Sequence, residues 1–474
     1  MNYIGELQMR PEQKSVGLLG VIRSKGKMYE YGLPEKQHIN INEDPTRLFH
    51  ISIALLGELA AAINRGVESP FSESELKKNL IFSAYFFDAY FQSKLNSAYD
   101  AYVLLLGAAS YYLCDLPGSS SVLTQKLQNG EINLDAGGLE NLLLFLLHGD
   151  WQIDIDENST YGERIAAVIR GVRQFFQNGT GEEKLLEFAV NLRREVYESG
   201  TPRQLLFADV TIAVLRSKIE RSTWKTLPSY SGLSLDTWRS ILQKDSFIKE
   251  LWPAQHLFGK KGVLQGASAV VQMPTSAGKT KSTELILRSA FLANRISLAV
   301  IIAPFRALCN ELSGSLTAAF DGEAITVNEL SDVLQIDYDN NDFTAKKTIM
   351  VATPEKMLYI LRHEPSLAQQ IGLLIFDEGH LFDDETRGAT YELLLTELLS
   401  LTSKDTQKVL ISAVLNNAET IGEWLNGEAN VVEGATLFPT SKSVGYVSWI
   451  GTLGQIQYFG AHRFGQYDYF VPLV

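Results

Sequence analysis

The sequence predicts an α/β domain built on a parallel sheet flanked by helices, preceded by a large all-α region. In the second half, short apolar runs alternate with helical patterns, at 268–273, 298–303, 348–352, 371–376 and 408–413. Such alternation is typical of parallel strands joined by crossover helices. From about 45 to 218, in contrast, apolar residues recur at helical spacing and strand signals are few.

The first half divides into amphipathic segments separated by turn signals such as Asn178-Gly-Thr-Gly181 and Ser199-Gly-Thr-Pro202. One segment contains Tyr85, Phe86, Phe87, Tyr90 and Phe91, which could stack on bases but in one helix favour a packed core. We expect 224–231 to be a linker into the second half. The predicted helices are 49–63, 73–95, 98–113, 119–127, 137–147, 162–176, 182–198 and 203–221.

A phosphate-binding turn is predicted at Met273-Pro-Thr-Ser-Ala-Gly-Lys-Thr280, between the apolar run 267–272 and the helical pattern 281–294. Backbone N–H groups of such a turn point at an anion, and the helix N-terminus adds positive partial charge. Lys279 would reach the β- and γ-phosphates, and Thr280 would ligate Mg²⁺. The alternative is a helix cap in a surface loop. The predicted nucleotide-binding residues of the turn are Pro274, Thr275, Ser276, Ala277, Gly278, Lys279 and Thr280.

Two carboxylates follow the apolar run 371–375, in Ile375-Phe-Asp-Glu-Gly-His380. The end of a buried strand is where ligands bind in open α/β folds. Asp377 would hold the Mg²⁺ shell, and Glu378 would orient and deprotonate the attacking water. We therefore assign catalysis to Lys279, Asp377 and Glu378. His380, two residues after the base, favours a polar relay over an ordinary surface histidine.

Further short segments precede and follow the phosphate-binding turn and the acidic box along the chain. They are Leu251-Trp-Pro-Ala-Gln255, Ala303-Pro-Phe-Arg-Ala-Leu308, Thr353-Pro-Glu-Lys356 and Ser412-Ala-Val414, followed by Leu415-Asn-Asn-Ala-Glu419. With Met273 in place of the usual opening glycine and the box Asp377-Glu-Gly-His380, they resemble the DExH-box helicases of superfamily 2. The similarity is to the superkiller-like group, which includes archaeal DNA-repair helicases, and it covers about 250–440.

The resemblance implies a RecA-like (P-loop) fold, with ATP and Mg²⁺ as cofactors. Gln255 would read the adenine edge, and His380 and Ser412 would couple the ATP site to the strand. Val414 departs from the threonine usual in the third motif and removes one hydroxyl from that coupling. The partner implied is single-stranded nucleic acid, with DNA favoured over RNA. The residues implied to contact it are Pro304, Arg306, Ala307, Thr353, Pro354, Glu355 and Lys356.

Helicases of this group need a second RecA-like domain with motifs IV to VI and arginine fingers. No Gln-x-x-Gly-Arg-x-x-Arg pattern follows residue 415, and the chain ends in the apolar run 469–474. We therefore expect the N-terminal portion of a longer helicase, nearly inactive by itself, or one whose second half is another chain. The expected regions are 1–230, a helical accessory or partner-docking region; 231–440, the first RecA-like domain; and 441–474, β-rich, extending that domain or beginning the bridge to a second.

The composition is that of an ordinary globular chain, with 45% hydrophobic and 20% charged residues. A net charge of −13 makes the chain a poor non-specific nucleic-acid binder, so strand contacts must be local, through residues such as Arg306 and Lys356. Cys114 and Cys309 suggest neither a disulfide framework nor a zinc site. The start is not a signal peptide, and the apolar stretches 102–113 and 296–304 are too short to span a bilayer. We expect a cytoplasmic protein with no membrane contact and an acidic surface insertion at 331–342.

Two functions remain open. The first is an ATP-dependent nucleic-acid helicase or translocase. Its layout resembles helicase subunits of bacterial antiphage systems such as Hachiman, in which a helicase restrains a partner nuclease; the nuclease would dock on the helical region. The second is a nucleotide-gated interaction protein with little unwinding activity.

Overall fold

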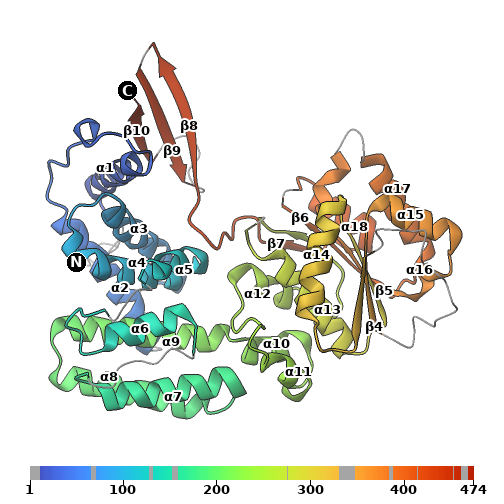
Figure 1. Ribbon diagram of the computed structural model, residues 1–474, viewed down its shortest axis with the longest axis horizontal. Coiled ribbons are helices and arrows are strands. Elements are labelled where there is room, and N and C mark those ends of the chain that lie inside the picture. Colours follow the sequence, from blue (N-terminus) through green and yellow to red (C-terminus); the bar gives the residue numbers. More distant parts are fainter. Residues whose placement is uncertain are drawn as a thin grey trace, which may run out of the picture. The chain divides into compact units, whose positions relative to one another are not determined.

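The computed structural model describes residues 11–65, 71–127, 132–151, 159–274, 276–329, 347–383, 388–413, 415–451, 453–460 and 468–473. The chain divides by its contacts into two compact units (Figure 1). The helical unit comprises Met1–Glu220 with Pro439–Val474, and the sheet unit comprises Arg221–Phe438.

The helical unit contains every helix that the first half of the sequence predicts, each within a few residues of the expected bounds. These are α2 (Thr46–Arg65), α3 (Glu73–Gln92), α4 (Asp100–Leu113), α5 (Pro117–Gln125), α6 (Leu139–His148), α7 (Gly162–Asn178), α8 (Glu182–Ser199) and α9 (Pro202–Arg221). A further helix, α1 (Gln13–Glu30), was not predicted, because glycine and serine interrupt its apolar positions.

Aromatic side chains of α3 fill the core between α2 and α4. Phe86 and Phe87 are fully buried, and Tyr90 is nearly so. All three rings pack edge-on against Phe49 of α2, with centroids 5.7–5.8 Å apart. These aromatics are therefore core residues, as expected, and do not form a base-stacking surface.

Helix α2 is long and apolar enough to cross a membrane by length and composition, which an inspection of uninterrupted apolar runs overlooks. One such helix is weak evidence for a membrane span, because core helices pass the same test. Leu48, Leu55, Leu56 and Leu59 form its buried face, and α2 packs on α3. Of its most apolar stretch, 33% is buried in the structure.

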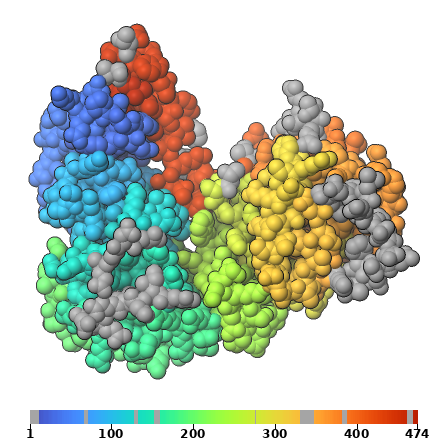
Figure 2. All heavy atoms as spheres, viewed as in Figure 1, coloured from blue at the N-terminus to red at the C-terminus, as the bar shows by residue number. Residues whose placement is uncertain are grey.

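The last residues form an antiparallel sheet in the order β10-β9-β8, from β8 (Ser443–Ile450), β9 (Leu453–Gly460) and β10 (Tyr469–Leu473). Strand β10 packs on α1, where Ser24 Oγ donates to the Phe470 carbonyl at 2.7 Å across 446 residues of sequence. Figure 2 shows this red C-terminal segment against the blue N-terminal helices. Close approach requires Gly20, whose added Cβ would lie 3.1 Å from the Asp468 carbonyl. By these contacts the segment groups with the helical unit, whereas we expected it to extend the RecA-like domain or to begin the bridge to a second one.

The sheet unit has a seven-stranded sheet in the order β3-β4-β2-β5-β6-β1-β7, with every neighbouring pair parallel. Five of its strands coincide with the predicted apolar runs: β1 (Ala269–Gln272), β2 (Leu298–Ile302), β4 (Lys347–Ala352), β5 (Ile371–Phe376) and β6 (Gln407–Ser412). The predicted fold class, a RecA-like parallel sheet preceded by a helical region, is confirmed. The edge strands β3 (Ile325–Glu329) and β7 (Val431–Glu433) were missed, because one alternates in burial and the other has three residues.

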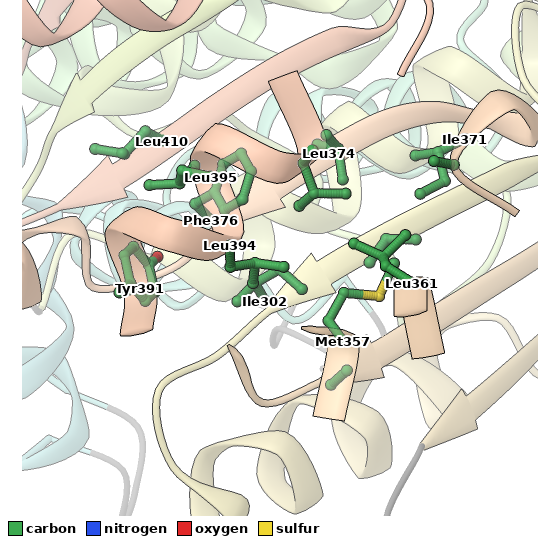
Figure 3. Packing of buried hydrophobic residues seen from close by; sticks show 14 of the residues in the cluster. Ile302, Met357, Leu361, Ile371, Leu374, Phe376, Tyr391, Leu394, Leu395 and Leu410 are labelled. Atoms are coloured by element: carbon green, nitrogen blue, oxygen red, sulfur yellow. The ribbon is translucent and has the colours of Figure 1, made fainter. Parts of the chain in front are cut away.

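Helices cover both faces of this sheet (Figure 1). In one layer, Met357, Leu361, Tyr391 and Leu394 pack against strand residues such as Phe376 (Figure 3). The helices of that layer are α15 (Pro354–His363), α16 (Leu367–Gln370), α17 (Gly388–Leu401) and α18 (Ala418–Asn426). The remaining helices are α10 (Thr223–Ser231), α11 (Leu235–Leu242), α12 (Pro253–Lys260), α13 (Lys279–Leu292) and α14 (Arg306–Ala319).

The prediction of a linker at 224–231 was wrong, because the segment is helix α10. Ser222 caps it by accepting a hydrogen bond from the Trp224 backbone N–H at 3.1 Å. Trp224 and Leu227 are buried in the sheet unit. Pro228 lies inside the helix, and this residue, with the serines around it, gave the sequence the look of a loop.

A buried ion network ties α13 to the end of α14. The Arg288 side chain is 1% exposed and donates to Glu284 Oε1 at 2.8 Å, Glu323 Oε1 at 2.7 Å and the Ala319 carbonyl at 2.6 Å. Its guanidinium lies over the Phe320 ring, 4.3 Å from the centroid. Removing this guanidinium would deprive the buried Glu284 carboxylate of a close cationic partner, which is costly.

Replacing Arg288 by methionine should destabilise the sheet unit by about 3–5 kcal/mol, because Glu284 would remain buried without its main partner. Arg239→Met is the matched control, since Arg239 and Asp236 form an exposed pair at 2.9 Å; its effect should be about 0–1 kcal/mol. Urea denaturation followed by hydrogen exchange of the sheet amides measures both. Equal effects of the two substitutions would contradict a structural role for the network.

Candidate functional site

The predicted phosphate turn lies at the carboxyl edge of the sheet, between the end of β1 and the start of α13. Gly278 caps the helix with a φ of +81°, a left-handed conformation that glycine adopts without strain. The Ala277 backbone N–H donates to the Pro274 carbonyl at 3.0 Å, which closes the turn. Ser276 is exposed and Thr280 is partly buried, whereas Thr275 lies outside the described residues.

Met273 explains the missing opening glycine. Its side chain is fully buried, and its N–H donates to the Ser412 carbonyl at 2.8 Å, so the first residue of the turn is still part of the sheet. A side chain is therefore accommodated in the core below the turn. The same hydrogen bond joins the phosphate turn to the end of β6, where the third helicase-like motif begins.

Gln255 lies beside the turn, as its predicted role requires. It is 4% exposed, and its Oε1 accepts a hydrogen bond from the Trp252 backbone N–H at 2.9 Å. Its amide nitrogen would lie 3.2 Å from a Cβ added at Gly278. The gap between Gln255 and the turn is therefore narrow. Because Gly278 has no side chain, its backbone stays accessible to a ligand there. The sequence did not indicate that Trp252 holds the amide in place.

The acidic box lies at the same edge, directly after β5. The Asp377 N–H donates to the Ile302 carbonyl at 2.9 Å, and Asp377 Oδ1 accepts from the Glu378 N–H at 2.9 Å. Glu378 has a φ of +53°, a left-handed conformation that costs a non-glycine residue energy and persists only when its surroundings enforce it. Gly379 is part of these surroundings, since it packs against Leu410 so closely that an added Cβ would lie 2.4 Å from Leu410 Cδ2.

The structure brings the predicted catalytic residues together. Lys279 Nζ lies 3.0 Å from Glu378 Oε1, with side-chain exposures of 10% and 22%. His380 Nδ1 lies 3.3 Å from Glu378 Oε2, so the histidine partners the candidate base. Ser412 is fully buried at the end of β6. The predicted pairing of His380 with Ser412 stays a prediction, and Val414 lies outside the described residues.

Asp377 is held in a low-dielectric position. Burial raises the pKa of its carboxyl, the charge of Glu378 raises it further, and Lys279 opposes both. Behind it, the Tyr391 hydroxyl donates to the Asp377 carbonyl at 3.1 Å, and burial raises the pKa of that phenol far above its usual range. Tyr391 therefore stays a neutral donor that fixes the box from α17. No motif in the sequence pointed to it, since it lies 14 residues beyond Asp377.

These residues fit a magnesium ion held together with a nucleotide. Mg²⁺ is bound in such sites through one or two carboxylates, substrate phosphates and water rather than by an all-protein cage. Asp377 offers the carboxylate, and Thr280 lies in the first turn of α13. Within the described ranges, no group of three or more His, Cys, Asp or Glu side chains is placed to hold a metal ion.

The predicted nucleic-acid residues lie at the ends of β2 and β4, which pair directly. The Ala303 N–H donates to the Ala352 carbonyl at 3.0 Å, so α14 and α15 begin from neighbouring strands. Two helix N-termini at one edge provide donors for phosphate oxygens. Arg306, Ala307 and Glu355 are exposed and Lys356 is partly so, whereas Pro304, Thr353 and Pro354 are buried and shape the turns. Phe305, which lies between Pro304 and Arg306 in the sequence, is 45% exposed and was not among the predicted contact residues.

This segment is similar to known proteins. Residues 253–421 match the DEAD/DEAH box helicase family. The Hachiman protein HamB of Bacillus cereus is 28% identical over 277 residues, which is 57% of this chain and 25% of HamB. The ATP-dependent DNA helicase Hel308 of Thermococcus kodakarensis is 34% identical over 39% of this chain and 16% of the relative. For Hel308 of Pyrococcus abyssi the identity is 34%, over 38% and 24%.

The chain therefore spans a quarter or less of these relatives. Among solved structures, the DUF1998 helicase MrfA aligns at 20% identity over 41% of this chain and 32% of that one, with a TM-score of 0.34, too low to bear on the site. The family match, in contrast, includes the phosphate turn, the acidic box and both predicted strand-contact turns. Residues 253–421 are a DEAD/DEAH box helicase domain of superfamily 2.

Proposed function

We propose that the protein is an ATP-dependent helicase or translocase acting on single-stranded nucleic acid, with Mg²⁺ as cofactor. The observation that carries the proposal is the ion pair of Lys279 with Glu378 at the carboxyl edge of a parallel sheet, within the helicase-family segment. DNA is the proposed strand, since Hel308 relatives are named DNA helicases. We also propose a cytoplasmic location.

In this function the Lys279–Glu378 pair is the resting arrangement of the site. The phosphates of a bound nucleotide compete with Glu378 for the ammonium of Lys279. When Lys279 moves to the phosphates, the Glu378 carboxylate is left to accept a proton from the attacking water. Asp377 and Thr280 would hold Mg²⁺, which supplies positive charge to the phosphate oxygens. Gln255, fixed beside Gly278, would select the adenine edge.

A second function is supported by the extent of the HamB similarity. It covers 57% of the chain, more than the sheet unit comprises, and therefore includes part of the helical unit. We propose that the helical unit docks a protein partner, such as a nuclease, in an antiphage system. The nucleotide bound to the sheet unit would control the activity of that partner. Strand displacement by the full-length protein, with and without ATP, separates the two: ATP-dependent unwinding supports the helicase, and its absence despite ATP turnover supports nucleotide-gated control.

Replacing Glu378 by glutamine should slow ATP turnover of the full-length protein by about 10²–10⁴ while ATP binding is retained, because an amide cannot accept the proton. Lys279→Ala should abolish turnover, because the phosphates lose their cation. Steady-state ATPase assays and binding of a fluorescent ATP analogue measure these effects.

Lys281→Ala is the control for Lys279. Lys281 lies in the same helix turn but is 44% exposed and pairs with Glu284 at 2.9 Å. Its turnover should equal that of the wild type. Unchanged turnover in Glu378→Gln would remove Glu378 from the role of base.

The 474-residue chain by itself should hydrolyse ATP very slowly and respond little to nucleic acid. Lys279 is the cation that the described site places against Glu378, whereas superfamily-2 helicases add arginines from a second RecA-like domain. An arginine finger contributes about 10³–10⁵ in rate where it has been measured. The measurement is turnover of this chain with and without single strands. Strong stimulation by a strand would mean that the arginines are already present, for example from a second copy.

Arg306→Ala should weaken single-strand binding in the full-length protein and reduce the salt dependence of log K by about 0.7 for each phosphate that the variant no longer neutralises. Arg306 is exposed in the first turn of α14, where the helix terminus reinforces binding of a phosphate. Arg362→Ala, in the last turn of α15, is the control and should leave the slope unchanged. Fluorescence anisotropy at several salt concentrations gives both slopes, and identical slopes for the two variants would exclude Arg306 as a strand-binding residue.

A further inference from the structure

A cavity of about 340 Å³ lies inside the helical unit, far in sequence from the helicase motifs. Helices α1, α3 and α4 and the C-terminal segment all contribute to its wall. Its charged lining residues are Arg23, Lys27, Lys442 and Asp88. Three of these four side chains are cations, although the whole chain carries −13. Carboxylates just outside the lining pair with two of them, Asp468 with Arg23 at 3.8 Å and Glu30 with Lys27 at 2.6 Å. The lining itself is therefore mainly cationic, in an acidic protein.

Arg23 is the central group of this cavity. Its guanidinium lies between two tyrosine rings, 4.5 Å from the centroid of Tyr85 and 4.4 Å from that of Tyr469. Two such cation–π contacts stabilise the guanidinium at this position. The Arg23 side chain is 15% exposed, so it is largely shielded from bulk water.

The hydrogen-bonding capacity of Arg23 is little used. A guanidinium has five N–H donors. Among the described residues it makes one hydrogen bond, to Ser443 Oγ at 3.3 Å, and its carboxylate neighbour Asp468 lies 3.8 Å away. For comparison, Arg193 in the same unit donates to Asp209 Oδ1 at 2.6 Å. A shielded, oriented guanidinium with so few close acceptors matches the planar recognition of an oxyanion.

Asp88, the carboxylate in the lining, is already engaged. Its two oxygens accept hydrogen bonds from Gln92 Nε2 at 2.7 Å and from the Tyr111 hydroxyl at 3.1 Å. Burial raises the pKa of Asp88, and its hydrogen bonds with Tyr111 and Gln92 oppose that shift. The opposing cations, Lys27 and Lys442, are compact charges on flexible stems that can approach a bound anion.

We propose that this cavity binds a phosphate group, with Arg23 as the bidentate donor and Lys27 and Lys442 neutralising the remaining charge. A phosphate monoester carries about −1.5 to −2 at neutral pH and can compete with Asp468 and Glu30 for the cationic side chains of the lining. The group could belong to free inorganic phosphate or to a small phosphomonoester such as a sugar phosphate. The volume has room for the second, and the tyrosine hydroxyls could bond to sugar oxygens. The site is independent of the proposed ATPase activity.

The test is calorimetric titration of the 474-residue chain carrying Lys279→Ala, so that the phosphate turn of the sheet unit does not contribute. The probes are inorganic phosphate, ribose 5-phosphate, ribose and a 5′-phosphorylated single strand. We expect one site that takes a phosphate-bearing probe and not ribose; the tighter of inorganic phosphate and ribose 5-phosphate identifies the source. No binding of either, or binding of the oligonucleotide alone, overturns the proposal.

Variants separate binding from a purely structural role of the stack. Arg23→Lys keeps the charge and loses the planar fork, and should raise the Kd at least tenfold. Lys27→Met should raise it several-fold without lowering Tm, because Lys27 otherwise pairs only with the exposed Glu30 among the described carboxylates. Arg47→Met, which removes an exposed cation paired with Glu12, is the matched control and should leave the Kd unchanged. If Arg23→Lys proves unstable, Lys27→Met decides: an unchanged Kd in that variant overturns the assignment.

Discussion

The ion pair between Lys279 and Glu378, 3.0 Å long, depends on how the sheet is ordered. Lys279 follows β1 and Glu378 follows β5, and both strands pair with β6 between them. Because all the strands run in parallel, their carboxyl ends meet at one edge, and residues about 100 positions apart in the chain come into contact. Every other feature of the proposed ATP site, from the Gln255 amide to the carboxylate of Asp377, is placed relative to this pair.

Local strain and close packing then fix the carboxylate against the lysine. Glu378 adopts a left-handed backbone, and Gly379 packs so tightly on Leu410 that no other residue fits without displacement. Tyr391 holds the preceding carbonyl from the core side. Strained residues at such positions persist because their neighbours leave no alternative. The arrangement orients Glu378 before any nucleotide arrives, which reduces the reorganisation that catalysis would require.

The helical unit shows a different constraint, in which the two ends of the chain pack against each other. Helix α1 and strand β10 pack together, and Arg23 is stacked between Tyr85 and Tyr469 from these distant segments. Side chains of α1, α3, α4 and the C-terminal segment together line the cavity.

The sequence by itself determined most of the local elements and predicted the chemistry of the motifs. Apolar periodicity predicted the central strands and the helices from α2 to α9, and the turn at Gly278 and the box at Asp377 predicted the ATP site, because each depends on neighbours within a few residues. Only the tertiary structure decided that β10 packs on α1, that 223–231 is a helix with buried residues, and that Tyr391 supports the box. These features rest on interactions between segments far apart in sequence, whose energies come from packing and burial that no local pattern encodes.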